Sequence, residues 1–124
     1  MNSVQGPFLP HRRVTTADTT NPTDNKTDGG IIDVFSWDRI VFELNYDANG
    51  GTKDLQVTPL WWNVESAAWM SDSEQGRQYV EDGTVLMTVS KRARYCWLKV
   101  TTISGGASKI VTIRASLQKA RLGD

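Results

Sequence analysis

The sequence predicts an all-β protein, an antiparallel β-sandwich that carries an extended N-terminal arm. From Ile31 onward, apolar and polar residues alternate with the period of two that a half-buried strand requires. Turn-forming residues recur about every ten residues along the same stretch, which is typical of sandwiches and barrels. Helical periodicity is nearly absent. The jelly roll is one form that such a sandwich can take.

Residues 1–30 are predicted to be an arm outside the domain, and residues 31–124 to be the sandwich. Between Thr15 and Asp28 the only apolar side chain is that of Ala17. One such side chain does not offset an ordering cost of about 1–2 kcal/mol per residue. We therefore expect the arm to be an extended tether that binds neighbouring subunits through four apolar anchors: Val4, Phe8, Leu9 and Val14.

A first hairpin is predicted for residues 39–46 and 52–60. Asn49-Gly50 between them is a strong signal for a type I′ turn, because both central residues of that turn need a positive φ. The turn sets the register, so that three apolar pairs share one face: Leu44 with Leu55, Phe42 with Val57, and Ile40 with Pro59.

A second hairpin is predicted for the last two strands, with its turn centred on Gly106 and Ala107. In this register one face is wholly apolar, and its buried residues are Cys96, Leu98, Val100, Val111, Ile113 and Leu117. The opposite face sets Lys99 directly across from Arg114, which is unfavourable unless an anion or a carboxylate lies between them.

The middle of the chain is less regular. Residues 84–90 are predicted to form a strand with Val85, Met87 and Val89 pointing inward, and residues 77–81 a short strand that ends at Asp82-Gly83. Residues 63–76 fit neither period, so we expect a long loop with one helical turn over residues 66–70.

Five tryptophans are many for a domain of this size. Trp61 and Trp62 are adjacent on a predicted strand, so their side chains point to opposite faces and at least one leaves the inner layer. Exposed Trp and Arg side chains are frequent anchors of protein interfaces. We therefore select Trp62, Trp97, Lys99 and Arg114 as a candidate interface, with burial of this face under the second sheet as the alternative.

Charge is divided unevenly along the chain. Residues 1–85 hold six Lys and Arg against thirteen Asp and Glu, a net charge of −7, and residues 86–124 hold eight against one, a net charge of +7. A basic half can indicate nucleic acid. Opposite halves also suit neighbouring subunits that meet acidic face to basic face, and we favour this second interpretation.

No group of residues specifies a reaction, so we expect no enzyme activity and no catalytic, cofactor or metal site. His11 is the only histidine and lies in the arm, where no core can position it. Cys96 is the only cysteine, which excludes an internal disulfide and a zinc site built from thiolates. The sequence shows no export signal and no apolar run long enough to cross a membrane, so we expect no membrane partner.

The stretch from Lys91 to Gln118, KRARYCWLKVTTISGGASKIVTIRASLQ, resembles the closing hairpin of small β-sandwich structural proteins of tailed bacteriophages. The resemblance is one of pattern: a basic turn, an aromatic-rich strand, a glycine-rich turn and a β-branched final strand. Such proteins include capsid decoration (cement) subunits and neck or tail adaptor subunits, which use extended N-terminal arms to bind neighbours. The resemblance implies a virion structural protein, assembled in the host cytoplasm, whose partners are other virion proteins and further copies of itself as a homo-oligomer.

Two alternatives to the virion structural role stay open at this point. One is a carbohydrate-binding module that holds a glycan on exposed tryptophans. The other is a nucleic-acid-binding module that uses the basic C-terminal half.

Overall fold

The computed structural model of the protein describes residues 3–8, 12–25 and 30–120. They form ten β-strands and one short 3-10 helix: β1 (Ser3–Phe8), β2 (Arg12–Val14), β3 (Ile32–Asp33), β4 (Arg39–Asp47), β5 (Leu55–Asn63), β6 (Ala68–Ser71), η1 (Ser73–Gln75), β7 (Arg77–Tyr79), β8 (Gly83–Ser90), β9 (Tyr95–Ile103) and β10 (Ile110–Ala120). No helix among these residues has the length and hydropathy needed to cross a membrane.

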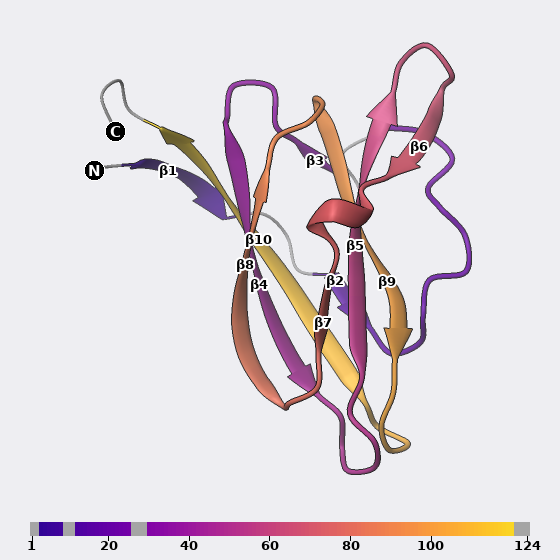
Figure 1. Ribbon diagram of the computed structural model, residues 1–124. Helices are drawn as coiled ribbons and strands as arrows, with labels where there is room; N and C mark the ends of the chain where they lie inside the picture. The colour runs from indigo at the N-terminus through magenta and orange to yellow at the C-terminus, as the bar shows by residue number, and fades with distance from the viewer. Residues whose placement is uncertain (1–2, 9–11, 26–29, 121–124) are drawn as a thin grey trace.

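Two antiparallel sheets pack face to face (Figure 1). In sheet A, β10 pairs with β4 on one side and with both β1 and β2 on the other, and β8 pairs with the far side of β4. In sheet B, β9 lies between β3 and β5, and the far side of β5 pairs with β6 and β7. The predicted antiparallel β-sandwich is confirmed.

The strand order is that of a jelly roll. β1 and β2 run as one interrupted strand along β10, and β6 and β7 do the same along β5. Counted in this way the described residues form eight strands, and the first pairs with the last, the second with the seventh, the third with the sixth and the fourth with the fifth. This nested pairing is the double Greek-key winding of jelly rolls.

Both predicted hairpins are wrong in their pairing. β4 and β5 lie in opposite sheets, as do β9 and β10, so the turns that join them are arches between the sheets. Phe42 lies opposite Ala115 of β10, and Val57 lies opposite Val100 of β9. Alternation fixes which face of each strand is buried. Two strands of a sandwich bury that face whether they lie side by side or face one another across the core.

The buried faces themselves are confirmed. All six residues predicted for the apolar side of the last two strands are at most 5% exposed: Cys96, Leu98, Val100, Val111, Ile113 and Leu117. Met87 and Val89 are buried as well. Trp61 packs in the core between the sheets and Trp62 lies on the outer face of sheet B, as adjacent strand residues must.

The two arches pack against one another at the lower end of the sandwich in Figure 1. Gly106 donates its backbone N–H to the carbonyl oxygen of Ala48 at 2.7 Å. Asn49 and Gly50 have φ values of 53° and 79°, so the predicted positive φ at both positions is confirmed. In the second arch the positive φ, 146°, belongs to Gly105, one residue earlier than predicted.

Residues 63–76 contain a strand where we expected a loop. β6 pairs with β5 and sets Trp69 opposite Trp62, and the two indole rings meet edge to face with their centroids 5.3 Å apart. The helical turn expected over residues 66–70 is wrong. In the described residues the helical turn is η1, a few positions later. Only Trp69 of β6 is buried, so this strand shows no alternation.

Candidate assembly surface

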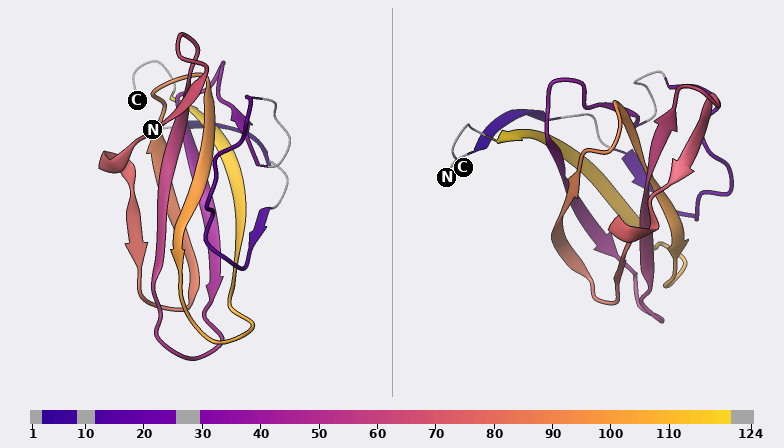
Figure 2. Two further views of the ribbon diagram at one scale, coloured as in Figure 1. Left: turned by 90° about the vertical axis from the view of Figure 1, so that its right-hand side faces the viewer. Right: turned by 45° about the horizontal axis from the view of Figure 1, so that its top comes forward.

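Residues 12–18 close one side of the sandwich. β2 pairs with β10 in sheet A, with Val14 opposite Val111. Asp18 then binds the edge of β9 in sheet B: its N–H donates to the carbonyl of Val100, and its carboxylate accepts the N–H of Val100, both at 2.8 Å. Figure 2 shows this part of the chain running along β9. The expectation that residues 1–30 lie outside their own domain is therefore wrong for this stretch, because backbone hydrogen bonds at two sheet edges hold a segment with few apolar side chains.

Arg12 connects residues 12–18 with the outer face of sheet B through three contacts. Its Nη1 donates to the carbonyl of Leu98 at 3.0 Å, and its Nη2 forms an ion pair with the carboxylate of Asp18. The guanidinium carbon lies 4.5 Å from the centroid of the Trp97 ring, in a cation–π contact. Arg12, Asp18 and Trp97 thus form one unit, which we call the N-terminal latch.

A polar cavity of about 480 Å³ lies beside the N-terminal latch. It is lined by Arg12, Asp18, Thr20, Asn21, Pro22, Thr23, Asp24, Ile31 and Trp97. The guanidinium of Arg12 and the carboxylate of Asp18 already bind one another and the edge of β9. The charges of Arg12 and Asp18 at this cavity are therefore already paired within the protein.

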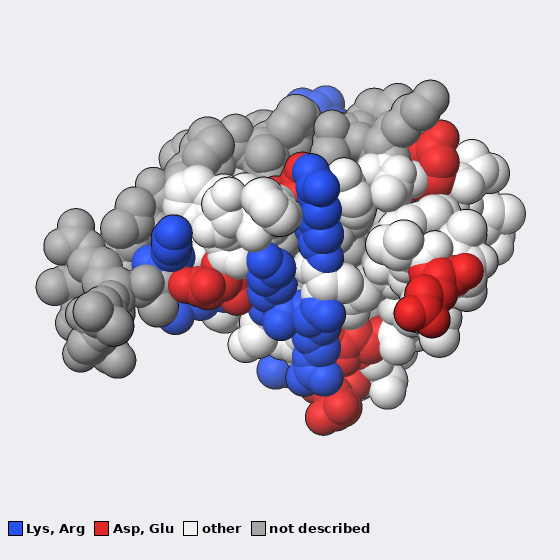
Figure 3. Space-filling view, turned by 90° about the horizontal axis from the view of Figure 1, so that it is seen from above, with Lys and Arg blue, Asp and Glu red and all other residues white. Residues whose placement is uncertain are grey.

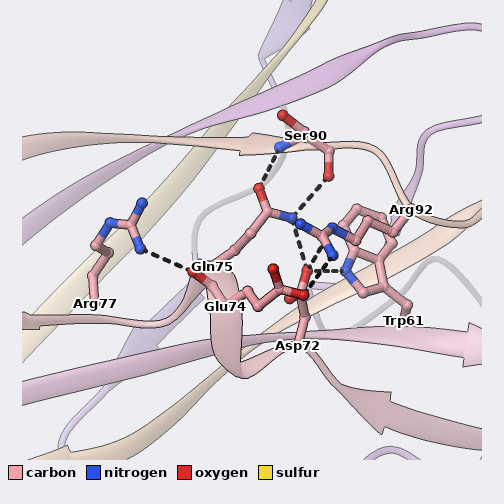
Figure 4. A network of polar contacts seen from close by, with 7 residues as sticks. All are labelled: Trp61, Asp72, Glu74, Gln75, Arg77, Ser90 and Arg92. Atoms are coloured by element: carbon pink, nitrogen blue, oxygen red, sulfur yellow. Dashed lines mark hydrogen bonds and ion pairs between the residues drawn. The ribbon is translucent and has the colours of Figure 1, made fainter.

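The opposite side of the sandwich is closed by a second network (Figure 4). Asp72 accepts hydrogen bonds from Trp61 Nε1 at 2.9 Å and from Gln75 Nε2 at 2.7 Å, and lies 3.3 Å from Arg92 Nε in an ion pair. Gln75 also reaches β8 in sheet A, where its amide accepts the N–H of Ser90 at 2.8 Å and donates to the carbonyl of Ser90 at 3.0 Å. This side-chain amide binds the two backbone groups as a neighbouring strand would.

The Asp72 network predicts a loss of stability in acid. Burial opposes ionisation of Asp72, but the hydrogen bonds from Gln75 and Trp61 and the charge of Arg92 outweigh it and hold the pKa below its usual value. A carboxyl with a lowered folded-state pKa stabilises the fold above its unfolded-state pKa of about 4, and this contribution disappears as the pH falls through the folded-state value. We expect Asp72→Asn to flatten the decline of the unfolding free energy between about pH 5 and pH 2.

The matched control is Glu74→Gln, because the Glu74 side chain is 80% exposed and also binds Arg92. Denaturant titrations at a series of pH values measure both variants. If the unfolding free energy of Asp72→Asn fell with decreasing pH as steeply as that of the unchanged protein, Asp72 would not be the source of the acid sensitivity.

The four residues chosen as a candidate interface do not form one patch. Lys99 lies opposite Thr58 on the outer face of sheet B, and Arg114 lies opposite Glu43 on the outer face of sheet A. The predicted contact of Lys99 with Arg114 is therefore wrong, because it depended on pairing β9 with β10. Trp97 is only 4% exposed.

Covering by the N-terminal segment explains this burial. Trp97 belongs to an aromatic cluster on the outer face of sheet B with Ile31, Leu60 and Trp69, and Trp62 packs half-buried at its margin. Trp97 is therefore buried, but Arg12 of the N-terminal segment covers it, and not the second sheet that we gave as the alternative. Of the four predicted residues, Trp62 is the one tryptophan with a partly exposed side chain.

The acidic and basic halves of the sequence meet within the chain. Arg92 contacts Asp72 and Glu74, and Arg94 binds Asp33 with Nη2 to Oδ2 at 3.0 Å. The hydrogen bond from Arg94 lowers the pKa of Asp33. Seen from above, Lys and Arg lie next to Asp and Glu rather than in a separate basic face (Figure 3). Part of the charge division thus stabilises the fold itself.

The anchors of the predicted arm have different positions. Val14 is 6% exposed and packs in the core between the sheets, so its role as an anchor on a neighbour is wrong. Val4 and Phe8 belong to β1, where they lie opposite Lys119 and Ser116 of β10. Leu9 lies outside the described residues.

β1 and the end of β10 project together from the sandwich. Residues 3–8 pair with residues 116–120, and we call this pair of segments the terminal ribbon. Residues 116–118 also pair with β4 on their other side, so the ribbon has only two strands beyond Gln118. Figure 1 and the right-hand view of Figure 2 show its end extending away from the body of the molecule. The outer edge of β1 pairs with no other strand in the described part of the chain.

The sequence analysis selected Trp97 of the N-terminal latch but missed Arg12 and Asp18, which it placed in the arm. No signal in the sequence separates Asp18 from the polar residues around it.

Cys96 is fully buried and burial raises the pKa of its thiol. Among the described residues no three His, Cys, Asp or Glu side chains are grouped to hold a metal ion. No protein family, curated protein or solved structure matches this chain.

Proposed function

We propose that this protein is a structural subunit of a virion, a capsid decoration or neck/tail subunit that binds neighbouring virion proteins through its terminal ribbon. The projection of β1 and the end of β10 from the sandwich is the observation that carries the proposal. Its partners are virion proteins and other copies of itself.

Beyond Gln118, where the pairing of β10 with β4 ends, the ribbon has no third strand beside it among the described strands. Isolated two-stranded ribbons are marginally stable in water, and an unpaired strand edge is a template for pairing with another chain. A partner that adds a strand to β1 on the N-terminal side of Pro7, or packs on the ribbon, satisfies both conditions. The ribbon therefore suits a subunit that is held within an assembly.

The jelly roll agrees with this proposal but also occurs in lectins, so it does not choose between them. The carbohydrate alternative needs an exposed indole ring. Trp61, Trp69 and Trp97 are at most 8% exposed, and the ring of Trp97 is covered by Arg12. The nucleic-acid alternative needs free cations, whereas Arg92 and Arg94 are paired with carboxylates. Trp37 and Trp62 are partly exposed, but each packs against a hydrophobic cluster, so we favour the assembly role over both alternatives.

Analysis of purified particles tests the proposal. Particles made from the genome that encodes this chain are banded on a density gradient, and their proteins are quantified by mass spectrometry. We expect the chain to band with the particles at a fixed ratio to the major capsid protein. A chain found only in the unassembled fraction would contradict a structural role.

A further inference from the structure

The four sheet edges of the sandwich differ in how they are protected. β3 is two residues long, and the edge made by β6 and β7 is interrupted by η1. The edge made by β1 and β2 contains Pro7 and two arginines, Arg12 and Arg13. β8 is eight residues long and has neither a charged residue nor a proline. Natural proteins usually protect edges with short strands, charges, proline, bulges or a covering loop, and the only such protection on β8 among the described residues is the contact of Gln75 with Ser90 at its end.

The backbone groups on the free side of β8 can be assigned from one contact. Gln75 binds both the N–H and the C=O of Ser90, so these groups point away from β4. Backbone groups point to alternate sides along a strand, so those of Thr84, Leu86 and Thr88 also point away from β4. β8 pairs only with β4 among the described strands. Three consecutive donor and acceptor pairs are thus left on this edge.

The side chains along this edge are self-complementary. Leu86 is 71% exposed on the outer face of sheet A, and Thr84 and Thr88 flank it on the same face, both exposed. Antiparallel pairing of two such strands about Leu86 sets Leu86 against Leu86, and Thr84 against Thr88 in both directions. Thr–Thr pairs across strands are favourable, and an interface of this kind obeys two-fold symmetry.

We propose that β8 pairs edge to edge with β8 of a second copy of this chain, antiparallel about a two-fold axis at Leu86. Charge does not oppose the contact. Glu43, the nearest outward acid beside Leu86, lies one strand further in and faces Arg114. The two copies of Glu43 are then three strand spacings apart, about 14 Å, which is longer than the screening length of about 8 Å at physiological salt.

Cysteine cross-linking of the full chain tests the register. In the proposed dimer the two Leu86 Cα atoms are about 5.5 Å apart, within the range of a disulfide. Leu86→Cys should therefore form a covalent dimer under mild oxidation. The control is Thr84→Cys: its two copies are four residues out of register, about 14 Å apart, and should give at least about fivefold less dimer. Native Cys96 is fully buried with a raised pKa and gives little background.

Sedimentation velocity tests the same edge without a disulfide. The unchanged chain should show a concentration-dependent dimer, and Leu86→Lys should raise its dissociation constant at least about tenfold. The control is Val64→Lys, because Val64 is 79% exposed in the turn between β5 and β6. This variant should leave the dissociation constant of the dimer unchanged. Equal cross-linking of both cysteine variants, or a monomer at every concentration up to about 0.2 mM, would overturn the proposal. The dimer does not depend on the virion role, so its absence leaves that role untouched.

Discussion

Replacing Gly105 by alanine should destabilise the protein by about 3 kcal/mol or more. A Cβ atom at this position would lie 2.1 Å from the carbonyl oxygen of Ala48, and the φ of Gly105 is 146°. The neighbour is backbone and cannot rotate away, so one of the two arches must move. Such a loss is a large part of the total stability of about 5–15 kcal/mol of a small domain.

Gly50→Ala is the matched control for this prediction. Gly50 also has a positive φ, 79°, but nothing lies within 4 Å of a Cβ added there. Its substitution should cost only the backbone strain, about 1 kcal/mol. Guanidinium titrations of both variants give the comparison. Equal losses at the two glycines would show that the arches do not pack as closely as the structure has them.

Asp18→Ala should lower the unfolding free energy by about 2–4 kcal/mol, although Asp18 lies in a polar segment. The substitution removes the acceptor of the Val100 N–H and leaves the guanidinium of Arg12 without its carboxylate. Both groups are partly buried, so water replaces the lost partner poorly.

Thr19→Ala is the control for Asp18→Ala, because Thr19 is the exposed neighbouring residue. Thermal and denaturant unfolding measure both variants. In a chain that already carries Arg12→Ala, Asp18→Ala should lower the unfolding free energy by less than it does in the unchanged chain, because the two side chains share one network. A melting temperature for Asp18→Ala equal to that of Thr19→Ala would mean that the N-terminal latch does not hold the sandwich together.

The sequence predicted the buried faces well because alternation depends on local chemistry. Leu98 and Ile113 are buried, Trp62 and Trp61 point to opposite faces, and Asn49 has the positive φ that its turn needs. Each of these features follows from a residue and its immediate neighbours in the chain. The antiparallel β-sandwich follows from the same features taken together.

The pairing of the strands could not be predicted in the same way. An Asn-Gly turn gives the same positive φ in a hairpin and in an arch between sheets, and Phe42 is buried in either arrangement. The error at the turns spread to the candidate interface, since Lys99 and Arg114 were placed together only by the assumed pairing of β9 with β10. Long-range pairing depends on which arrangement closes the whole sandwich, and no single segment carries that information.

The arm was misjudged for a different physical reason. Counting apolar side chains measures what a segment can bury, and the count is low between Thr15 and Asp28. Asp18 is held instead by backbone groups of Val100 that would otherwise be unpaired at the edge of β9. Hydrogen bonds of this kind depend on the position of the strand, which the segment's own sequence does not encode.

Deleting residues 1–8 tests most directly the claim that the terminal ribbon serves assembly while residues 12–18 serve the fold. We predict that the shortened chain still folds cooperatively and loses less unfolding free energy than a chain lacking residues 1–18, because residues 116–118 of β10 keep their pairing with β4. It should fail to join particles when it competes with the full chain during assembly. A chain lacking residues 1–18 serves as the contrast and should unfold far more easily, since it also loses the N-terminal latch. Incorporation of the chain lacking residues 1–8 at the level of the full chain would contradict the proposed function.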